Sequence, residues 1–308
     1  MANSKKHILK NILISSVSII LGVVVIGLVV VYFYTPRYFI NEKPLDTSET
    51  HSGITIMSAN VRTYTPTDFF KRSWFYRAKL FNLDIEQVNP DIICFQEATP
   101  THFKYFTKVL EGYSGTITYR DESKSSEGCP IFYKTSLFDL VDEGHFWLSE
   151  TPDKISISWN SAYYRICSYV ILKEKESGIN FVVFNTHLDS SSEEARINGI
   201  KLVLSKINEF GGYRSFLMGD FNDFLGSDTL NYALSNFLDS QAVADVTDDG
   251  CTYQDWGEKL YKGRIDFIMI SRTGIKVNLY NILQKEETSH KNEYSSDHYP
   301  IYINVSFQ

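Results

Sequence analysis

A run of 23 residues without a charged side chain, residues 12–34, constrains this chain more than any other feature of its sequence. An α-helix rises about 1.5 Å per residue, so a helix of this length crosses a hydrocarbon core of about 30 Å with modest tilt. Tyr32 and Tyr34 lie at the end of the run, where aromatic side chains favour the membrane interface. The run therefore predicts one N-terminal transmembrane helix.

A cleaved signal peptide is the alternative interpretation of the same run. The apolar region of a signal peptide usually spans about 7–15 residues and ends at small side chains. Residues 12–34 are longer and end in the bulky sequence VYFY, so we expect an uncleaved anchor. Three lysines lie within residues 5–10, and Arg37 and Lys43 follow the run. This small bias favours a single-pass protein of the cell membrane, with a cytoplasmic N-terminus and its main part outside.

The rest of the chain divides into three parts. Residues 1–11 form the short cytoplasmic N-terminus, and residues 35–52 contain the prolines and polar side chains that are typical of a tether. Residues 53–308 suit one large domain, with many of the 21 Phe and 20 Tyr available for its core. The net charge of −7 argues against a broad, non-specific grip on a nucleic-acid backbone. The net charge does not exclude small phosphorylated substrates.

The four cysteines show neither a CxxC motif nor a tight framework. Cys94 and Cys167 lie in apolar, strand-like runs, so the sequence predicts buried free thiols. Whether any of the four cysteines pair is left open by the sequence.

Strand-like apolar runs alternate with helical stripes along the predicted domain. Helical patterns cover residues 74–88, 101–110, 193–207 and 227–237, and Ser191 with Glu194 could form a capping box before the third of them. Strand-like runs lie at residues 53–60, 91–96, 163–172, 179–185, 215–220, 264–270 and 299–307. This order predicts an α/β (α+β) fold: a four-layer sandwich of two packed mixed β-sheets flanked by helices.

Polar side chains close nearly every strand-like run. Each one alone could be an ordinary turn residue, but a carboxylate within the run RIDFI is costly to bury unless it is paired. Repeated placement of Asn, Glu, Asp and His at strand ends is harder to explain by turns. The residues concerned are Asn60, Glu97, Asn185, His187, Asp220, Asn222, Asp266, Asp297 and His298.

Six short stretches carry these residues in order: SANVR, DIICFQE, NTHLD, GDFND, RIDFI and SDHYP. Together they resemble the endonuclease/exonuclease/phosphatase superfamily, which has the deoxyribonuclease I-like fold. The resemblance runs from Asn60 to Pro300, and residues 145–165 are similar to a bacterial branch of hydrolases in this superfamily. It implies a bacterial enzyme that hydrolyses phosphoesters with a divalent metal ion, and the apolar run at residues 12–34 adds a membrane anchor.

The resemblance implies Glu97 as the principal metal ligand, with Asn60 and Asp297 near it. Mg²⁺ prefers oxygen ligands and keeps several waters, so these side chains suit Mg²⁺, with Mn²⁺ as the alternative. The sequence SEGCPIFY departs from the Gly-Glu that related members often show, and Glu127 is its nearest match. The expected role of Glu127 is to orient His187 or to help bind substrate.

The resemblance also implies the catalytic residues. Asp220 would orient or deprotonate the attacking water, and Asn222 would hold the phosphate. His298 would stabilise the phosphoryl oxygens, held in one tautomer by Asp266. His187 would be a second imidazole on the opposite side. Which residue is the general base and which the general acid is left open.

Other candidates are less clear from the sequence. Arg165 could bind a substrate phosphate or form a structural salt bridge, whereas Arg77 and Arg264 are expected to be structural. Trp147 and Trp159 could line a substrate rim or pack in the fold. The sequence shows no basic cluster near the site, and three histidines, His51, His102 and His290, are expected to be solvated.

The sequence therefore predicts a membrane-anchored, metal-dependent phosphoester hydrolase, either a phosphodiesterase or a phosphomonoesterase. An extracellular nuclease of the same fold is the alternative. A non-catalytic binding module is disfavoured because no expected site residue is missing. The phosphorylated substrate could be a small molecule, a lipid or a nucleic acid, and the sequence implies no protein partner. Oligomeric state is left open.

Overall fold

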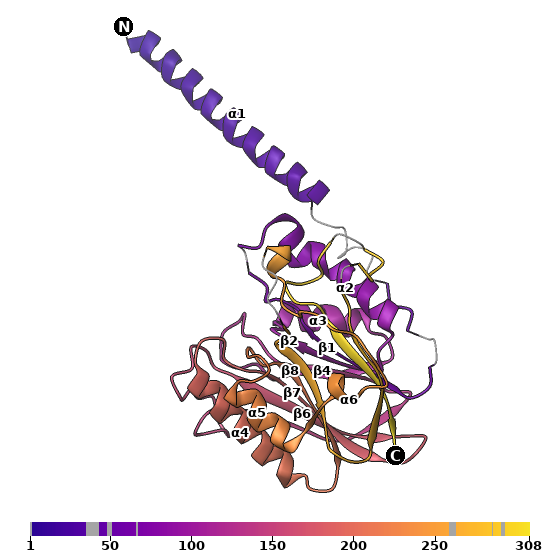
Figure 1. The fold of residues 1–308 in the computed structure, drawn as a ribbon. Helices are drawn as coiled ribbons and strands as arrows, with labels where there is room; N and C mark the ends of the chain where they lie inside the picture. Colours follow the sequence, from indigo (N-terminus) through magenta and orange to yellow (C-terminus); the bar gives the residue numbers. More distant parts are fainter. Residues whose placement is uncertain are drawn as a thin grey trace.

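A computed structural model describes residues 2–34, 43–47, 51–65, 67–258, 263–284, 286–290 and 293–308. The N-terminal helix α1 (Ala2–Tyr34) is one continuous helix and begins ten residues before the predicted span at residue 12 (Figure 1). Within α1, Lys10–Val30 has a mean hydropathy of 2.9 and none of it is buried. This segment is long and apolar enough to cross a membrane.

The first sheet has seven strands in the order β10-β12-β13-β1-β2-β4-β3. The central strands β1 and β2 are parallel, whereas β13 is antiparallel to β1. The sheet is therefore mixed. Its strands are β1 (Ile54–Asn60), β2 (Ile92–Gln96), β3 (Tyr113–Thr116), β4 (Ile131–Lys134), β10 (Val246–Thr247), β12 (Ile275–Ile282) and β13 (Ile301–Phe307).

The second sheet has six strands in the order β5-β6-β7-β8-β11-β9. Here β7 and β8 are parallel and the remaining neighbours are antiparallel. Its strands are β5 (Phe138–Trp147), β6 (Ile166–Glu174), β7 (Asn180–His187), β8 (Arg214–Asp220), β9 (Leu238–Asp239) and β11 (Asp266–Ile270).

The two sheets pack face to face, with helices on both outer faces, so the predicted four-layer sandwich is confirmed (Figure 1). Alternate residues of the strands fill the core between the sheets, including Ile56, Val183 and Ile303. Helices α2 (Trp74–Val88) and α3 (Pro100–Val109) cover the first sheet. Helices α4 (Glu193–Glu209) and α5 (Asp228–Asn236) cover the second. Three short elements complete the fold: η2 (Phe70–Arg72), α6 (Ser240–Val243) and η3 (Asp255–Gly257).

Helix α2 follows the predicted stripe, because Trp74, Ala78, Phe81 and Ile85 are all buried against the first sheet. The capping of α4 differs from the prediction. Its N-cap is Ser192, whose Oγ accepts a hydrogen bond from the backbone N–H of Ala195, and not Ser191. The backbone N–H of Ser191 instead donates to the carboxylate of Asp189, which holds the turn before the helix.

The predicted tether, residues 35–52, lies partly outside the described residues, since residues 35–42 and 48–50 are not described. Its described part contacts the domain. Leu45 is buried, and its backbone N–H donates to the carbonyl of Val109 at 2.9 Å. The chain therefore packs on the α2–α3 layer before β1 begins.

The prediction that three histidines are solvated is wrong for His102 and His290. His51 is exposed, as predicted, but its Nε2 lies 2.8 Å from a carboxylate oxygen of Asp91. The buried ring of His102 caps α3 through Thr99. His290 is buried too, with its Nε2 2.6 Å from Asp84. Sequence patterns miss such partners because His290 and Asp84 are 206 positions apart. Cys94 and Cys167 are buried free thiols, as predicted.

Candidate active site

The predicted site residues lie at one end of the two sheets because six strand ends meet there. Strands β1, β2, β7 and β8 run towards this end, and the antiparallel strands β11 and β13 start from it. The register places Asp220 beside both His187 on β7 and Asp266 on β11. The sequence placed Asp266 within a strand-like run, but in the structure Asp266 is the first residue of β11. A carboxylate at a strand end can reach both a cavity and a partner side chain.

A cavity of about 490 Å³ opens at this end of the sandwich. This volume suits a small-molecule site. Its walls come from both sheets and from the loops that follow their strands. Eight predicted site residues line it: Glu97, Glu127, Arg165, His187, Asp220, Asn222, Asp297 and His298. Asn60 and Asp266 do not line it but contact residues that do.

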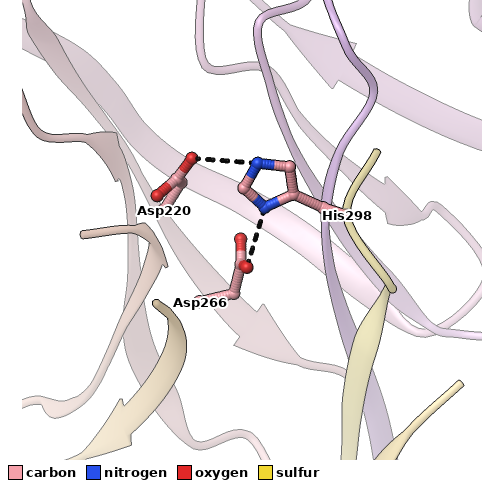
Figure 2. Close-up of side chains that lie close together, drawn as sticks. All are labelled: Asp220, Asp266 and His298. Carbon is pink, nitrogen blue, oxygen red and sulfur yellow. Dashed lines mark hydrogen bonds and ion pairs between the residues drawn. The ribbon is translucent and has the colours of Figure 1, made fainter. Parts of the chain in front are cut away.

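His298 lies between two carboxylates (Figure 2). Its Nδ1 is 2.9 Å from Asp266 Oδ2, and its Nε2 is 3.7 Å from Asp220 Oδ2. Burial disfavours the charged imidazole, but the charges of Asp266 and Asp220 outweigh it and raise the pKa of His298 to about 10. His298 is therefore an imidazolium at neutral pH, with Nδ1 donating to Asp266.

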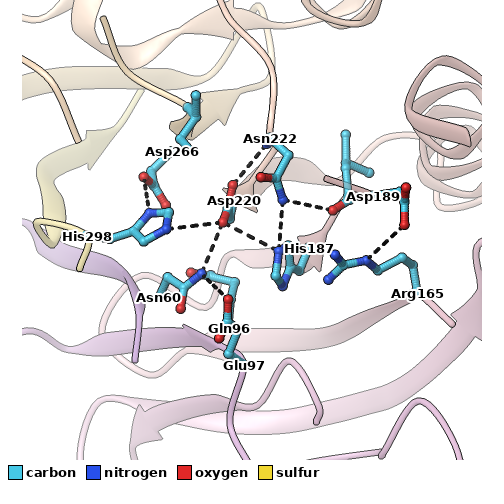
Figure 3. Close-up of polar contacts among 12 residues, drawn as sticks. Asn60, Gln96, Glu97, Arg165, His187, Asp189, Asp220, Asn222, Asp266 and His298 are labelled. Carbon is cyan, nitrogen blue, oxygen red and sulfur yellow. Dashed lines mark hydrogen bonds and ion pairs between the residues drawn. The ribbon is translucent and has the colours of Figure 1, made fainter. Parts of the chain in front are cut away.

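Asp220 is the centre of the polar network (Figure 3). Its Oδ2 accepts from Asn60 Nδ2 at 3.0 Å, and its Oδ1 accepts from the backbone N–H of Asn222 at 2.9 Å. Burial raises the pKa of Asp220 to about 7, although the charge of His298 opposes this rise and that of Asp266 adds to it. A carboxylate that titrates near neutral pH suits a general base.

His187 is held as a neutral ring. Burial, together with the charges of Arg165 and Arg120, holds its pKa well below the usual value. Asn222 Nδ2 donates to the carbonyl of Leu188 at 3.0 Å and lies 2.9 Å from His187 Nε2. The amide nitrogen is therefore the donor, and His187 Nε2 is the unprotonated acceptor.

Sequence and structure comparisons agree with this geometry. Residues 57–298 match the model of the Endonuclease/Exonuclease/phosphatase family. The chain belongs to this family. In the same fold, the mannosyl-6-phosphatase of Bacteroides thetaiotaomicron VPI-5482 is 30% identical, with a TM-score of 0.75. That match covers 82% of this chain and all of the phosphatase. A functionally unknown conserved protein of Enterococcus faecalis V583 is 27% identical, with a TM-score of 0.75, over 83% of this chain and all of that one.

Curated relatives in the endonuclease/exonuclease/phosphatase family are more distant. The CCR4-Not complex 3'-5'-exoribonuclease subunit Ccr4 of Candida albicans is 24% identical over 82% of this chain. This chain spans only 41% of that relative's length. Nocturnin of Rattus norvegicus is 25% identical over 86% of this chain and 68% of its own length. The family is one of phosphoester hydrolases. The names of Ccr4 and of the Bacteroides phosphatase indicate different substrates, RNA and a mannosyl 6-phosphate.

Two carboxylates of the family site face the cavity as possible metal ligands, Glu97 and Asp297. Burial raises the pKa of Asp297, and the charge of Glu97 adds to this rise, while His298 and Arg62 oppose it. Burial also opposes ionisation of Glu97, but hydrogen bonds from Thr63 and Asn60 hold its pKa below the usual value. Because the two carboxylates repel each other, a divalent cation beside them would relieve the repulsion. Their oxygens fit Mg²⁺ or Mn²⁺.

Asn60 lies beside Glu97, as predicted, and contacts Asp220 as well. Its Nδ2 donates both to Glu97 Oε1, at 3.1 Å, and to Asp220 Oδ2, while its Oδ1 accepts from the backbone N–H of Arg62. The amide therefore orients two carboxylates and turns its nitrogen, not its oxygen, towards Glu97. Among the described residues, Asp220, Asp266 and His298 also bring three ligand-type atoms within 4.8 Å of one another. Because His298 is charged, its ring nitrogens carry protons and do not bind a metal ion.

In the described part of the chain, no hydrogen bond or ion pair joins Glu127 to His187. Its carboxylate accepts from Arg120, with Oε2 2.8 Å from Nη1. Burial and the charge of Glu97 raise the pKa of Glu127, and Arg120 and Arg165 oppose this rise. Arg165 Nε lies 3.7 Å from Asp189, so the structural salt bridge exists, and Arg165 also lines the cavity (Figure 3). Both sequence interpretations of Arg165 are thus compatible with its position.

The sequence pointed to Arg165 but missed the other arginines on the basic side of the site. Three arginines line the cavity, Arg62, Arg120 and Arg165, although they are widely separated in the chain. Arg62 was visible in the stretch SANVR, but nothing in the sequence linked Arg120 to the site.

Arg77 and Arg264 are structural, as predicted: Arg77 binds backbone carbonyls and Arg264 pairs with Asp239. Trp147 is buried and donates to the carbonyl of Arg120, and neither Trp147 nor Trp159 lines the cavity.

Three residues of the cavity adopt the left-handed backbone region: Arg62 (φ 55°), Glu97 (φ 59°) and Asn222 (φ 50°). Non-glycine residues adopt this region at a cost of about 1–3 kcal/mol each, and such strain concentrates at functional sites. Each follows a strand end by one or two residues. At each of these turns the residue lines the cavity.

Proposed function

We propose that this chain is a membrane-anchored, metal-dependent phosphoester hydrolase. The observation that carries the proposal is the presence of two groups in one cavity. The Asp266–His298–Asp220 array provides a fixed positive charge and a carboxylate that titrates near neutral pH. Glu97 and Asp297, which line the same cavity, provide oxygen ligands. Together they supply the charge stabilisation and proton transfer that phosphoester hydrolysis requires.

Glu97 and Asp297 would hold the cation, with Asn60 orienting Glu97. A bound Mg²⁺ or Mn²⁺ supplies Lewis-acid stabilisation of charge on a phosphoryl oxygen. Arg62 Nη1 lies 3.7 Å from Asp297 Oδ2. This ion pair would help to hold the Asp297 carboxylate in place at the cavity.

Asp220 would take the proton of the attacking water through Oδ2. Its Oδ1 is held by the backbone N–H of Asn222, so the carboxylate is fixed before substrate binds. Asn222 and His187 would position the phosphate beside it. His298, charged and held by Asp266, would stabilise the phosphoryl oxygens as negative charge shifts on to them.

The membrane part of the proposal rests on α1. Its apolar segment, Lys10–Val30, is exposed throughout and is long enough to span a bilayer. Lysines at positions 5, 6 and 10 support a cytoplasmic N-terminus and a catalytic domain outside. The 30% identity to a Bacteroides protein supports a bacterial source.

Substrate testing separates the candidate functions. The full-length chain in detergent would be assayed with a sugar monophosphate, a phospholipid, single-stranded RNA and DNA, each with Mg²⁺ or with EDTA. Turnover of at least one phosphoester that EDTA abolishes and Mg²⁺ restores is the expected result. Turnover of only RNA or DNA would favour the extracellular nuclease, and no turnover of any substrate would favour the binding module.

A further inference from the structure

One wall of the cavity has no part in the proposed chemistry. It consists of Arg120, Glu127, Tyr163 and Arg165, hereafter the arginine–tyrosine wall, and all four side chains line the cavity. Tyr163 is 50% exposed, and the guanidinium carbons of Arg120 and Arg165 each lie 5.3 Å from the centre of its ring. The wall thus offers an aromatic face beside charged hydrogen-bonding groups.

The wall is fixed by a buried carboxylate. Asp189 Oδ2 accepts from Ser161 Oγ at 2.9 Å and from the backbone N–H groups of Ala162 and Tyr163 at 3.1 and 3.3 Å. The same oxygen lies 3.7 Å from Arg165 Nε. The loop and the arginine are therefore ordered before any ligand arrives, which lowers the cost of binding.

The charges of the wall are already balanced. Glu127 pairs with Arg120 at 2.8 Å, and Asp189 pairs with Arg165. A second phosphate group would have to compete with both carboxylates, and burying it beside them would be unfavourable. Arg120, Arg165 and Glu127 all line the cavity. Guanidinium donors therefore lie beside a carboxylate acceptor on the wall, without an excess of positive charge.

We infer that the arginine–tyrosine wall binds the alcohol part of the substrate, and that this alcohol is a hydroxyl-rich ring, such as a sugar, with a single phosphate. Hydroxyl groups both donate and accept, so they match guanidinium donors next to the Glu127 carboxylate. The exposed ring of Tyr163 covers the apolar face of such a ring. The inference rests on the proposed phosphoester hydrolysis and names the substrate class for the same cavity.

The test measures kcat and KM of the full-length protein in detergent with Mg²⁺. Three substrates are compared: a hexose 6-phosphate, methyl phosphate and a hexose bisphosphate. The wild type should prefer the hexose monophosphate. Tyr163→Ala should raise KM for the hexose monophosphate about tenfold, because it removes one contact worth that factor. Its kcat/KM for methyl phosphate should stay within about twofold of wild type.

Tyr232→Ala is the matched control. Tyr232 is also an exposed tyrosine beside a cation, with Lys201 Nζ 5.6 Å from its ring centre, but it lies on α5 and does not line the cavity. It should leave all constants unchanged. An equal loss on hexose phosphate and methyl phosphate in Tyr163→Ala, or a wild-type preference for the bisphosphate, would overturn the inference. Failure of the wild type to hydrolyse any phosphoester would instead overturn the proposed function.

Discussion

Asp266 Oδ2 lies 2.9 Å from His298 Nδ1, and the two residues come from separate strand ends that are 32 positions apart in the chain. Both side chains are almost fully buried. The carboxylate fixes the ring orientation and favours its charged form, so the opposite nitrogen faces Asp220 and the cavity. The pair therefore acts as one unit, and this has measurable consequences.

His298→Ala should lower kcat by about 10²–10⁴, because it removes electrostatic stabilisation of the transition state. Asp266→Asn should lose a large part of the same factor, since an amide can present its NH₂ group to the ring. The double variant should be far less damaged than the product of the single effects, because groups that act as a unit are not additive. Steady-state kinetics with melting temperatures would measure this. Normal turnover by a folded His298→Ala variant would contradict the catalytic role.

The pH dependence of kcat/KM should be bell-shaped. The Asp220 carboxyl, with its pKa raised to about 7, is neutral in acid and cannot accept a proton there, so activity should rise through that pH. The His298 imidazolium, with its pKa raised to about 10, loses its charge only in alkali, so activity should fall there. Asp220→Asn should remove the rising limb from the residual activity. A rising limb that survives in this variant would assign it to another group.

Metal binding should depend on Glu97. Glu97→Gln keeps the size and the hydrogen bond to Thr63 but removes the negative charge, so affinity for Mn²⁺ should fall by about tenfold or more. Electron paramagnetic resonance of free Mn²⁺ measures this without any enzyme assay. Glu258→Gln is a control, because Glu258 pairs with Arg72 on the surface and does not line the cavity. Equal Mn²⁺ affinity in wild type and Glu97→Gln would remove Glu97 from the metal site.

Gly219→Ala should destabilise the domain by about 3 kcal/mol and reduce activity. A Cβ there would lie 1.8 Å from the carbonyl oxygen of Thr186, so β7 and β8 would have to separate next to Asp220. Gly212→Ala controls for backbone strain alone, because Gly212 also has positive φ but has open space around it. Gly212→Ala should lower the free energy of unfolding by only about 1 kcal/mol. Urea unfolding of both variants measures the difference, and equal costs would contradict the steric explanation.

The full-length protein should remain in the membrane fraction after washing with alkaline carbonate. Replacing two apolar residues of α1 with charges, as in Val24→Lys with Ile26→Lys, should release it, since each buried lysine opposes insertion by about 3 kcal/mol. Ser16→Lys with Ser18→Lys lies nearer the N-terminal end and should release less. Recovery of a soluble protein trimmed at its N-terminus would support the signal-peptide alternative.

Much of the fold was predictable because it depends on local periodicity. Trp74, Ala78, Phe81 and Ile85 repeat at helical spacing, and they are the buried face of α2. The apolar runs around Ile93 and Val183 became strands for the same reason. Strand β5 (Phe138–Trp147) was not predicted, because its middle combines apolar and polar residues without regular alternation and is exposed on an edge of the second sheet.

The candidate site was predictable in membership but not in its contacts. The order of the short motifs identified Glu97, Asp220, Asp266 and His298, and the structure gathers them at one end of the sheets. The motif order could not identify Arg120, because that residue reaches the cavity only through the loop before β4. Nor could it show that Glu127 pairs with Arg120 and not with His187.

The sequence by itself determined the apolar length of α1, the type of most core elements and the set of acidic, amide and imidazole groups at the strand ends. Only the tertiary structure decided which of these groups touch. Asn60 donates to Asp220 across 160 positions of chain, and this contact depends on how two separate sheets stack. Hydrogen bonds act over about 3 Å, whereas local patterns carry no information about distance between sheets. Side-chain partners, charge balance and the shape of the cavity therefore follow from packing.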